Sequence, residues 1–327
     1  MVSRTKYQID NPTIETLFCA ANIEGVTNIA PLGAGEYNAV FSVTAGGKEY
    51  VLKIAPTEDI PVLTYEKDMM ASEVHWYQVM KDAGLISVPD IYFTDFSKQL
   101  IPAHYFIMEK ILGQQLDKID LSETEKTEAA AATAKMVAQM HKSKNDKFGY
   151  IQNELYEDWH QAIRAMVTAV LADCARKGRQ SKRGKQLLQY IERYKDVLAQ
   201  AECCMVNFDV WPPNIMARRE NGAIHYSWID PERSYWGDPI VDFVCLEMMT
   251  PFAEKKISLE AYNAEADSPV LLTREETIRY AVALGYLAVI MEVERYYRYT
   301  WHHFGWWRNV LASKMLFRSA FEILKNG

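Results

Sequence analysis

The hydrophobic pattern of residues 1–109 is mainly that of β-strands. The segment IAPLGAGEYNAVFSVTAGGKEYVLKIAP predicts a strand, a glycine turn and two further strands joined by a hairpin turn at AGGK. The segments VPDIYFTDF and AHYFIMEKI predict two more strands. Apolar residues recur at helical spacing in residues 12–24, and a second helix is predicted for residues 66–83, ending at Gly84. This part of the chain therefore predicts a sheet with one central helix.

The pattern becomes helical after the segment LGQQL. Residues 121–142 begin with the capping box SETE, and further helices are predicted near 156–177 and 183–201. A short β-rich stretch follows, with strands near 203–207, 214–218 and 224–229. Helices resume near residue 240 and continue to the end. The pattern as a whole favours an α+β protein with a small antiparallel sheet lobe and a larger, mainly helical lobe.

Composition narrows the class of protein. Of 327 residues, 49% are hydrophobic, which is enough for a large core without disulfide or metal cross-links. The net charge of −7 argues against a broad nucleic-acid-binding surface. Five cysteines without a CxxC pair argue against a disulfide framework and a zinc site. No signal-peptide pattern and no membrane-spanning apolar run is visible, so we expect a cytoplasmic protein with no membrane or nucleic-acid partner and leave its oligomeric state open.

Two features of the sheet region suggest a phosphate-binding role. Gly33 and Gly35 lie between two predicted strands, and glycine lets backbone amides approach a phosphate closely. A plain glycine hairpin is the alternative, because the segment is neither a dinucleotide-binding nor a Walker A motif. Lys53 lies in an apolar strand, where an unpaired charge is costly, and Glu73 on the next helix is a candidate partner. The alternative places Lys53 on the solvent side of an edge strand.

The segment NFDVWPPNIM has a stiff turn between two polar residues. Asp209 follows a short apolar strand, Asn214 begins another, and Pro212 and Pro213 fix the turn between them. Asp230 ends the strand HYSWI sixteen residues after Asn214. We expect two hairpin strands to bring Asp209, Asn214 and Asp230 to neighbouring loop ends.

These three residues have the chemistry that phosphoryl transfer needs. Carboxylate and amide oxygens are hard ligands that suit Mg²⁺. A carboxylate that stays off the metal could accept a proton from a substrate hydroxyl group. The alternative for any of these acids is a turn cap or a helix N-cap, and for Asp238 and Asp242 we favour that alternative.

Taken in order, these motifs resemble the aminoglycoside phosphotransferase and choline kinase-like family, which shares the protein-kinase-like fold. The resemblance covers nearly the whole chain, from LGAGEYNAV to GDPIVDF. It includes the segments YFIMEKILGQQL, VAQMH, DVWPPNI and WIDPERSYWGDPIVDF. Their order and spacing together are more specific than any one of them.

The resemblance implies a two-lobed protein-kinase-like fold and an activity. Residues 1–109 would form the nucleotide-binding lobe, and residues 110–327 would form the catalytic and substrate-binding lobe. The implied reaction is an ATP- or GTP- and Mg²⁺-dependent transfer of the γ-phosphoryl group to a hydroxyl of a small molecule. An aminoglycoside, an amino alcohol or a sugar-like compound would be the acceptor.

The resemblance also implies roles for matched residues. Asp209 would be the catalytic base or an acid that orients the substrate, while Asn214 and Asp230 would hold Mg²⁺. The implied nucleotide-binding residues are Gly33, Gly35, Lys53 with Glu73 fixing it, and the backbone from Glu109 to Ile111. Asp238 would support its loop, and His141 would be a packed or hydrogen-bonded residue rather than a catalytic one.

One departure from the family pattern keeps a second function open. The chain has Asn207-Phe208-Asp209 where the family commonly has His-Gly-Asp. Phenylalanine does not adopt a positive φ as easily as glycine does. A nucleotide-binding pseudokinase that acts as a regulator is therefore the alternative to an active enzyme. A scaffold protein without a ligand would leave the ordered motifs unexplained.

Residues 291–310 are rich in Tyr, Trp and His. They predict either an aromatic wall for a flat or cationic substrate or ordinary helix packing, and we favour packing. Four acids could line a pocket for an aminoglycoside: Glu232, Asp238, Glu292 and Glu294. The basic stretch RKGRQSKRGK is interpreted as a solvated loop.

Overall fold

The computed structural model describes residues 6–33 and 37–327. The chain forms two compact units, and both are built from separate stretches of sequence. The first contains residues Met1–Pro61, Ser87–Gln114 and Met216–Ile229, and the second contains Val62–Ile86, Gln115–Ile215 and Asp230–Gly327. The functional division into lobes of residues 1–109 and 110–327 stays a prediction.

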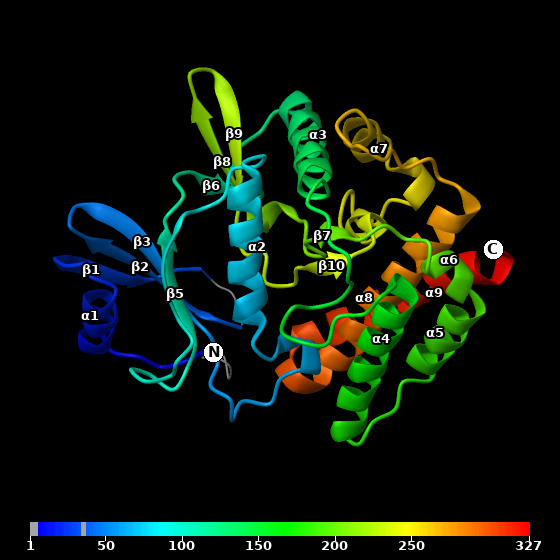
Figure 1. Cartoon of the computed structure of the whole chain (residues 1–327), viewed down its shortest axis with the longest axis horizontal. Coiled ribbons are helices and arrows are strands. Elements are labelled where there is room, and N and C mark those ends of the chain that lie inside the picture. The colour runs from blue at the N-terminus through cyan, green and yellow to red at the C-terminus, as the bar shows by residue number, and fades with distance from the viewer. Residues whose placement is uncertain (1–5, 34–36) are drawn as a thin grey trace. The chain divides into compact units, whose positions relative to one another are not determined.

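The first unit is built around a five-stranded antiparallel sheet (Figure 1). Its strands, in spatial order, are β1 (Val26–Pro31), β2 (Ala39–Ala45), β3 (Lys48–Ile54), β5 (Tyr105–Glu109) and β4 (Ile91–Asp95). All five strands were predicted from alternating apolar residues, and all five are confirmed. The sheet order makes β3 a central strand.

Helix α1 (Asn11–Ala20) covers part of this sheet. The Asp10 side chain accepts a hydrogen bond from the Thr13 backbone N–H and so caps the first turn. Ile14, Leu17 and Phe18 recur at helical spacing and are fully buried in one core with the inward residues of the strands. The helix predicted for residues 12–24 is confirmed with shorter bounds.

A second, three-stranded sheet contains β6 (Gln114–Gln115), β8 (Ile215–Glu220) and β9 (Ala223–Trp228). The chain passes very close to β8 at Gly113, which has a φ of 131°. A Cβ atom there would lie 2.6 Å from the Ala217 carbonyl oxygen, so only glycine fits this crossing.

The second unit is mainly helical. Its α-helices are α2 (Met69–Ala83), α3 (Glu123–Met140), α4 (Trp159–Arg176), α5 (Lys182–Arg193), α6 (Lys195–Leu198), α7 (Lys256–Asn263), α8 (Arg274–Arg298) and α9 (Phe304–Asn326). Short 3₁₀ turns occur at Thr64–Glu66, Pro212–Asn214, Pro239–Val244 and Phe252–Glu254. The predicted capping box of α3 is confirmed at Ser122 and Glu125. Helices α8 and α9 lie side by side at the end of the chain (Figure 1).

The strands predicted near residues 203–207, 214–218 and 224–229 are present, but their pairing and the helix expected from residue 240 need correction. Residues 203–207 and 214–218 do not form a hairpin. Instead β7 (Cys204–Val206) pairs with β10 (Tyr235–Gly237), and β8 pairs with β9. The reason is local, because Pro212 and Pro213 form a 3₁₀ turn and lack the N–H groups that a strand ladder needs. Residues near 240 likewise form a 3₁₀ turn, and the next α-helix begins only at Lys256.

The α+β prediction, with a sheet-based part and a larger helical part, is confirmed. Among the residues that the structure describes, no helix is both long enough and apolar enough to cross a membrane.

Candidate active site

The loop Asn207–Asn214, called the 207–214 loop below, follows the buried strand β7. The Asn207 side-chain oxygen accepts a hydrogen bond of 3.0 Å from the Asp209 backbone N–H. The Asn214 amide nitrogen donates to the Asp209 carboxylate and to its carbonyl oxygen, both at 3.1 Å. The structure therefore brings two of the predicted site residues, Asp209 and Asn214, into direct contact.

The orientation of the Asn214 amide bears on its predicted metal role. Both hydrogen bonds to Asp209 use the amide nitrogen, which leaves the amide oxygen as an acceptor that could bind a cation. Asn214 is 5% exposed and ends the 3₁₀ turn formed by Pro212 and Pro213. The two prolines hold Asn214 at a fixed distance from Asp209 because their φ angles are locked.

Phe208 has a left-handed backbone with a φ of 57°. A non-glycine residue in this region carries strain of about 1–2 kcal/mol. Tight packing compensates, because the ring is 1% exposed and lies against Tyr286 at 5.4 Å and Tyr235 at 5.8 Å between centroids. The backbone conformation that glycine adopts easily is therefore present with phenylalanine.

Asp242 anchors the loop from outside, and our interpretation of it as a turn cap was wrong. Its fully buried carboxylate accepts backbone N–H bonds from Asn207 at 3.2 Å and from Phe208 at 2.6 Å. It also accepts a bond of 2.9 Å from Nε2 of His141. A carboxylate that meets three donors in the core fixes the loop before Asp209.

The neighbouring residues Asp238 and His141 behave as expected. Asp238 caps the turn Pro239–Val244 through the Ile240 N–H at 3.1 Å, and its carboxylate pairs with Arg279 at 3.2 Å. The Nδ1 atom of His141 contacts the Tyr262 hydroxyl at 2.8 Å. Both ring nitrogens of this buried histidine are occupied, so it supports the structure, as predicted.

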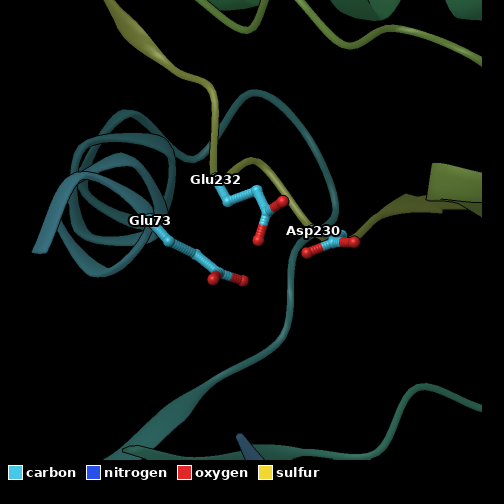
Figure 2. A group of neighbouring side chains, drawn as sticks. All are labelled: Glu73, Asp230 and Glu232. Atoms are coloured by element: carbon cyan, nitrogen blue, oxygen red, sulfur yellow. The ribbon is translucent and has the colours of Figure 1, made fainter. Parts of the chain in front are cut away.

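Asp230 belongs to a cluster of three carboxylates with Glu73 and Glu232 (Figure 2). One oxygen of each residue lies within 4.8 Å of the others. Glu73 is on α2, whereas Asp230 and Glu232 come from the loop after β9, and the three side chains point toward one another in Figure 2. Asp230 has a φ of 58°, and its N–H donates to the Tyr77 hydroxyl at 2.9 Å. Helix α2 thus contributes to holding this strained position.

The donor set of the cluster suits a divalent cation. All three groups are hard oxygen ligands, the type that Mg²⁺ prefers, and like charges this close favour a bound cation. The sequence predicted Asp230 as a metal ligand and named Glu232 only as a candidate acid of an aminoglycoside pocket, whereas the structure brings the two carboxylates together. The signal was present, because Glu232 follows Asp230 by two residues in the segment DPER.

The electrostatic surroundings of Asp209 favour proton acceptance. Burial raises the pKa of its carboxyl above the ordinary value, the guanidinium of Arg233 opposes this rise, and the charge of Asp230 adds to it. The hydrogen bond from Asn214 lowers the pKa in turn. A carboxylate with a raised pKa is a stronger base than an exposed one.

The predicted nucleotide-binding residues of the first unit are found on or beside its sheet. Lys53 is 4% exposed on the central strand β3, so the alternative of a solvent-facing edge strand was wrong. Gly33 has a φ of 74°, a conformation that favours glycine. Glu109 ends β5 and accepts a hydrogen bond from the Asp90 N–H at 3.2 Å, and Ile111 follows two residues later. Gly35 lies outside the described residues.

Lys53 and Glu73 belong to different units, and each unit is described by itself. Their pairing stays a prediction. Within the second unit, Glu73 is fully buried and lies in the carboxylate cluster with Asp230. This neighbour of Glu73 was not foreseen from the sequence.

The aromatic segment 291–310 is only partly core. Tyr296 and Trp306 are half-buried and contact each other at 5.4 Å between centroids. Trp301, Phe304 and Trp307 are more than half exposed. The packing interpretation therefore fails for these three residues, which lie after the end of α8. This segment is called the α8–α9 junction below.

Comparison with known proteins identifies relatives. The model of the family described as "phosphotransferase enzyme family" matches residues 28–275. Among curated proteins, none matches the sequence.

Several solved structures are similar. A Ralstonia eutropha JMP134 protein described as a candidate aminoglycoside phosphotransferase is 14% identical, with a TM-score of 0.66 over 98% of this chain and 99% of that one. Choline kinase LicA from Streptococcus pneumoniae is 16% identical, with a TM-score of 0.60 over 97% of this chain and 99% of that one. The streptomycin–ATP complex of APH(2")-IIa is also 16% identical, with a TM-score of 0.58 over 94% of this chain and 97% of that one. These likenesses confirm the predicted fold.

Proposed function

Because the chain belongs to the phosphotransferase enzyme family, we propose that it transfers the γ-phosphoryl group of ATP or GTP to a hydroxyl group of a small molecule. The observation that carries this proposal is the contact between Asp209 and Asn214 on one anchored loop. Such a pair separates a proton-accepting group from a metal-binding group, which is the arrangement that phosphoryl transfer uses.

The residues present fit Mg²⁺. Asp230 and the amide oxygen of Asn214 would hold it, as the family resemblance implies, and Glu232 is a further carboxylate donor in the cluster. When bound, the ion neutralises negative charge on the phosphates of the donor. Glu73 would either be a further oxygen ligand of the ion or orient Lys53. The Asp230→Ala variant tests whether the carboxylate cluster binds the ion.

Asp209 would act on the acceptor. Its carboxylate would accept a hydrogen bond from the substrate hydroxyl and take its proton as the new P–O bond forms and the bond from the γ-phosphorus to the departing nucleoside diphosphate breaks. The bond from the Asp209 N–H to the Asn207 side chain and the bond from Asn214 keep the carboxylate in place, so the acceptor meets a preorganised base.

The first unit would bind the nucleotide. Lys53 would contact the α- and β-phosphates, Gly33 and Gly35 would let backbone amides approach them, and the backbone from Glu109 to Ile111 would bind the base. The buried position of Lys53 on a central strand supports this role, since a buried ammonium needs negative partners.

The alternative of an inactive pseudokinase rested on Phe208, which occupies the position where the family commonly has glycine. Phe208 nevertheless adopts a φ of 57°, so the substitution leaves the left-handed backbone before Asp209 intact. Asp209, Asn214, Asp230 and Lys53 are all present.

The test is turnover with purified protein, Mg²⁺ and ATP or GTP, while aminoglycosides, amino alcohols and sugars are offered and nucleoside diphosphate is measured. We expect acceptor-dependent release that Asp209→Ala lowers by about 10²–10⁴-fold, because general base catalysis contributes that much. Nucleotide binding should survive this change. Unchanged turnover in Asp209→Ala would contradict the mechanism.

A second variant tests the metal site. Asp230→Ala should abolish the dependence of nucleotide affinity on Mg²⁺, measured by calorimetry with and without the ion. The matched control is Asp267→Ala, which removes a carboxylate of the same unit that lies outside the cluster. Normal Mg-ATP affinity in Asp230→Ala would contradict the metal assignment.

A further inference from the structure

Four acids of the second unit could have bound the ammonium groups of a polycationic acceptor. Two of them have structural partners instead. Asp238 is fully buried and pairs with Arg279 at 3.2 Å, and Glu292 accepts a hydrogen bond of 2.5 Å from the Ser181 hydroxyl. Glu232, the third, lies in the carboxylate cluster that the proposed function assigns to a metal ion.

The fourth acid, Glu294, is the centre of a buried ion-pair network. It is 6% exposed and pairs with Arg233 at 3.2 Å and with Arg298 at 3.1 Å. Arg298 pairs in turn with the buried Glu66. The Asn309 amide donates to the second oxygen of Glu294 at 3.3 Å. Both oxygens of Glu294 are therefore engaged, and the two guanidinium groups balance the two carboxylates.

Arg295 follows Glu294 directly but, unlike Arg233 and Arg298, forms no ion pair with a carboxylate of the described residues. Its guanidinium lies 4.8 Å from the ring centroid of Tyr296 and 5.3 Å from that of Trp306. One nitrogen donates to the Tyr296 hydroxyl at 2.7 Å, while Nε is buried and finds no hydrogen-bond acceptor in the described part of the chain. Two aromatic faces hold the cation while leaving a donor unused.

Arg308, next to Asn309, is the second such cation. It donates to the Tyr299 hydroxyl at 3.0 Å and to the Asn309 side-chain oxygen at 3.3 Å, and it lies over the ring of Tyr299. Within residues 6–33 and 37–327, no carboxylate lies within 4.0 Å of a nitrogen of Arg295 or Arg308. The α8–α9 junction thus presents guanidinium groups whose charge is not neutralised by an ion pair with these residues.

The junction is linked to the reacting group through residues of the same unit. Arg308 donates to the Asn309 side-chain oxygen at 3.3 Å, and the Asn309 amide in turn donates to Glu294. Glu294 pairs with Arg233, whose charge acts on the pKa of Asp209. A chain of side-chain contacts therefore leads from Arg308 to Arg233, which lies in the loop that carries Asp230 and Glu232, and Arg295 contacts Trp306 two residues before Arg308.

From this arrangement we infer that the acceptor carries an anionic group, a carboxylate or a phosphate, and that Arg295 and Arg308 bind it. The inference deepens the proposed function and rests on it for the claim that the bound compound is the acceptor. Guanidinium groups recognise carboxylate and phosphate oxygens through charge-assisted hydrogen bonds. The same two cations repel a compound with several ammonium groups, and Asp238 and Glu294 are already ion-paired with arginines.

The experiment compares compounds that share a skeleton and differ in charge. One set is glucose, glucosamine, glucuronate and glucose 6-phosphate, and a second is tyrosol, tyramine and hydroxyphenylacetate, with kanamycin as the polycation. Binding is measured by calorimetry without nucleotide. We expect the anionic member of at least one set to bind more tightly than its neutral and cationic partners. Comparing glucuronate with glucose 6-phosphate separates carboxylate from phosphate recognition.

Variants locate the binding site. Arg295→Gln and Arg308→Gln should each weaken binding of the preferred anion by about tenfold or more, because a hydrogen bond to a charged group contributes about 1.5–3 kcal/mol. The neutral partner should bind each variant as it binds the original chain. Arg318→Gln is the matched control, since it removes an exposed guanidinium from the same helix α9. Circular dichroism and thermal unfolding check that each variant is folded.

Two results would overturn the inference. One is tighter binding of glucosamine, tyramine or kanamycin than of every anion, or no anion binding at millimolar concentration. The other is anion binding that Arg295→Gln and Arg308→Gln leave unchanged. Because binding is read without nucleotide, the result is separate from phosphoryl transfer. If the protein binds the anion at these arginines but never transfers phosphate, the anion-binding site is supported and the proposed function is contradicted.

Discussion

The 207–214 loop and the α8–α9 junction belong to the same unit and are built on opposite principles. In the loop, a buried carboxylate from Asp242, two prolines and a packed Phe208 ring fix the backbone on each side of Asp209. In the junction, three aromatic rings are exposed, and Arg295 and Arg308 lack carboxylate partners among the described residues. The 207–214 loop is fixed by internal contacts, whereas the junction has exposed rings and arginines that a ligand could contact.

Under the proposed function, this difference would separate the chemical step from the selection of the acceptor. A proton acceptor must be held within a fraction of an ångström, so buried networks and strained backbone are worth their cost there. A surface that selects a substrate needs charged groups and hydrogen-bond donors that have no partner within the protein, because the substrate binds to those groups. The predictions below test whether the two regions differ in this way.

The largest effect should come from Asp242→Ala. The change leaves two buried backbone N–H groups and Nε2 of His141 without an acceptor, so we expect a loss of about 3–5 kcal/mol in the free energy of unfolding. Turnover should fall as well, because Asp209 loses its support. Chemical denaturation measures the first effect. The control Asp267→Ala, at a site away from this network, should stay within about 0.5 kcal/mol. A stable, active Asp242→Ala would mean that the loop holds itself.

The pH profile should show the next effect. Burial raises the pKa of Asp209, and only the ionised form can accept a proton. As pH falls through that raised pKa, kcat/KM should drop by about tenfold per unit, starting above the range of an ordinary aspartate near 3.9. Thermal unfolding at each pH excludes denaturation as the cause. An acid limb at or below the ordinary aspartate range would contradict the buried environment of Asp209.

A comparison of two substitutions at Phe208 isolates backbone strain. Phe208→Ala and Phe208→Gly both lose the contacts with Tyr286 and Tyr235. Only glycine removes the cost of the left-handed conformation, so Phe208→Gly should be more stable than Phe208→Ala by about 1 kcal/mol. Urea unfolding of the pair measures the difference. Equal stabilities would show that the residue leaves the positive φ once its ring is gone.

The smallest effect should be that of Trp307→Ala in the junction. The ring is more than half exposed, so the free energy of unfolding should change by less than about 0.5 kcal/mol. If the ring contacts the acceptor, KM should rise while kcat is retained. Kinetics with the acceptor that supports turnover would measure this. A large loss of stability in Trp307→Ala would show that this ring packs as a core residue does, and the junction would then not differ from the 207–214 loop in this respect.

The sequence singled out the polar residues of the candidate site, but it did not predict the contacts that hold them. Asp209, Asn214 and Asp230 were visible because polar residues at the ends of apolar strands, next to prolines, stand out in the local pattern. The predicted strands are present as β7, β8 and β9, but the pairing of β7 with β10 was not predicted, because strand partners depend on long-range pairing. Alternating apolar residues sufficed for the five strands of the first unit, where neighbours in sequence are mostly neighbours in the sheet.

Other features of the site could be recognised only from the three-dimensional structure. Nothing local distinguishes Asp242, which binds the loop, from Asp238, which caps a turn, since both precede or lie in the same 3₁₀ segment. The exposure of the junction's three aromatic rings was likewise hidden, because helical spacing alone does not show which face finds a partner. The family resemblance is confirmed by the match over residues 28–275. It implied a metal-binding role for Asp230 and none for Glu232.

The anchor of the 207–214 loop also has a consequence for folding kinetics. Asp242 meets His141 across a separation of 101 residues, and His141 meets Tyr262 of α7 across 121. Contacts between such distant parts of a chain form late, because closing long loops is entropically unfavourable until the surrounding structure exists. The loop can therefore take its final form only after α3 and α7 have come together. In a refolding experiment, secondary structure should return first, and enzymatic activity should be among the last properties to recover.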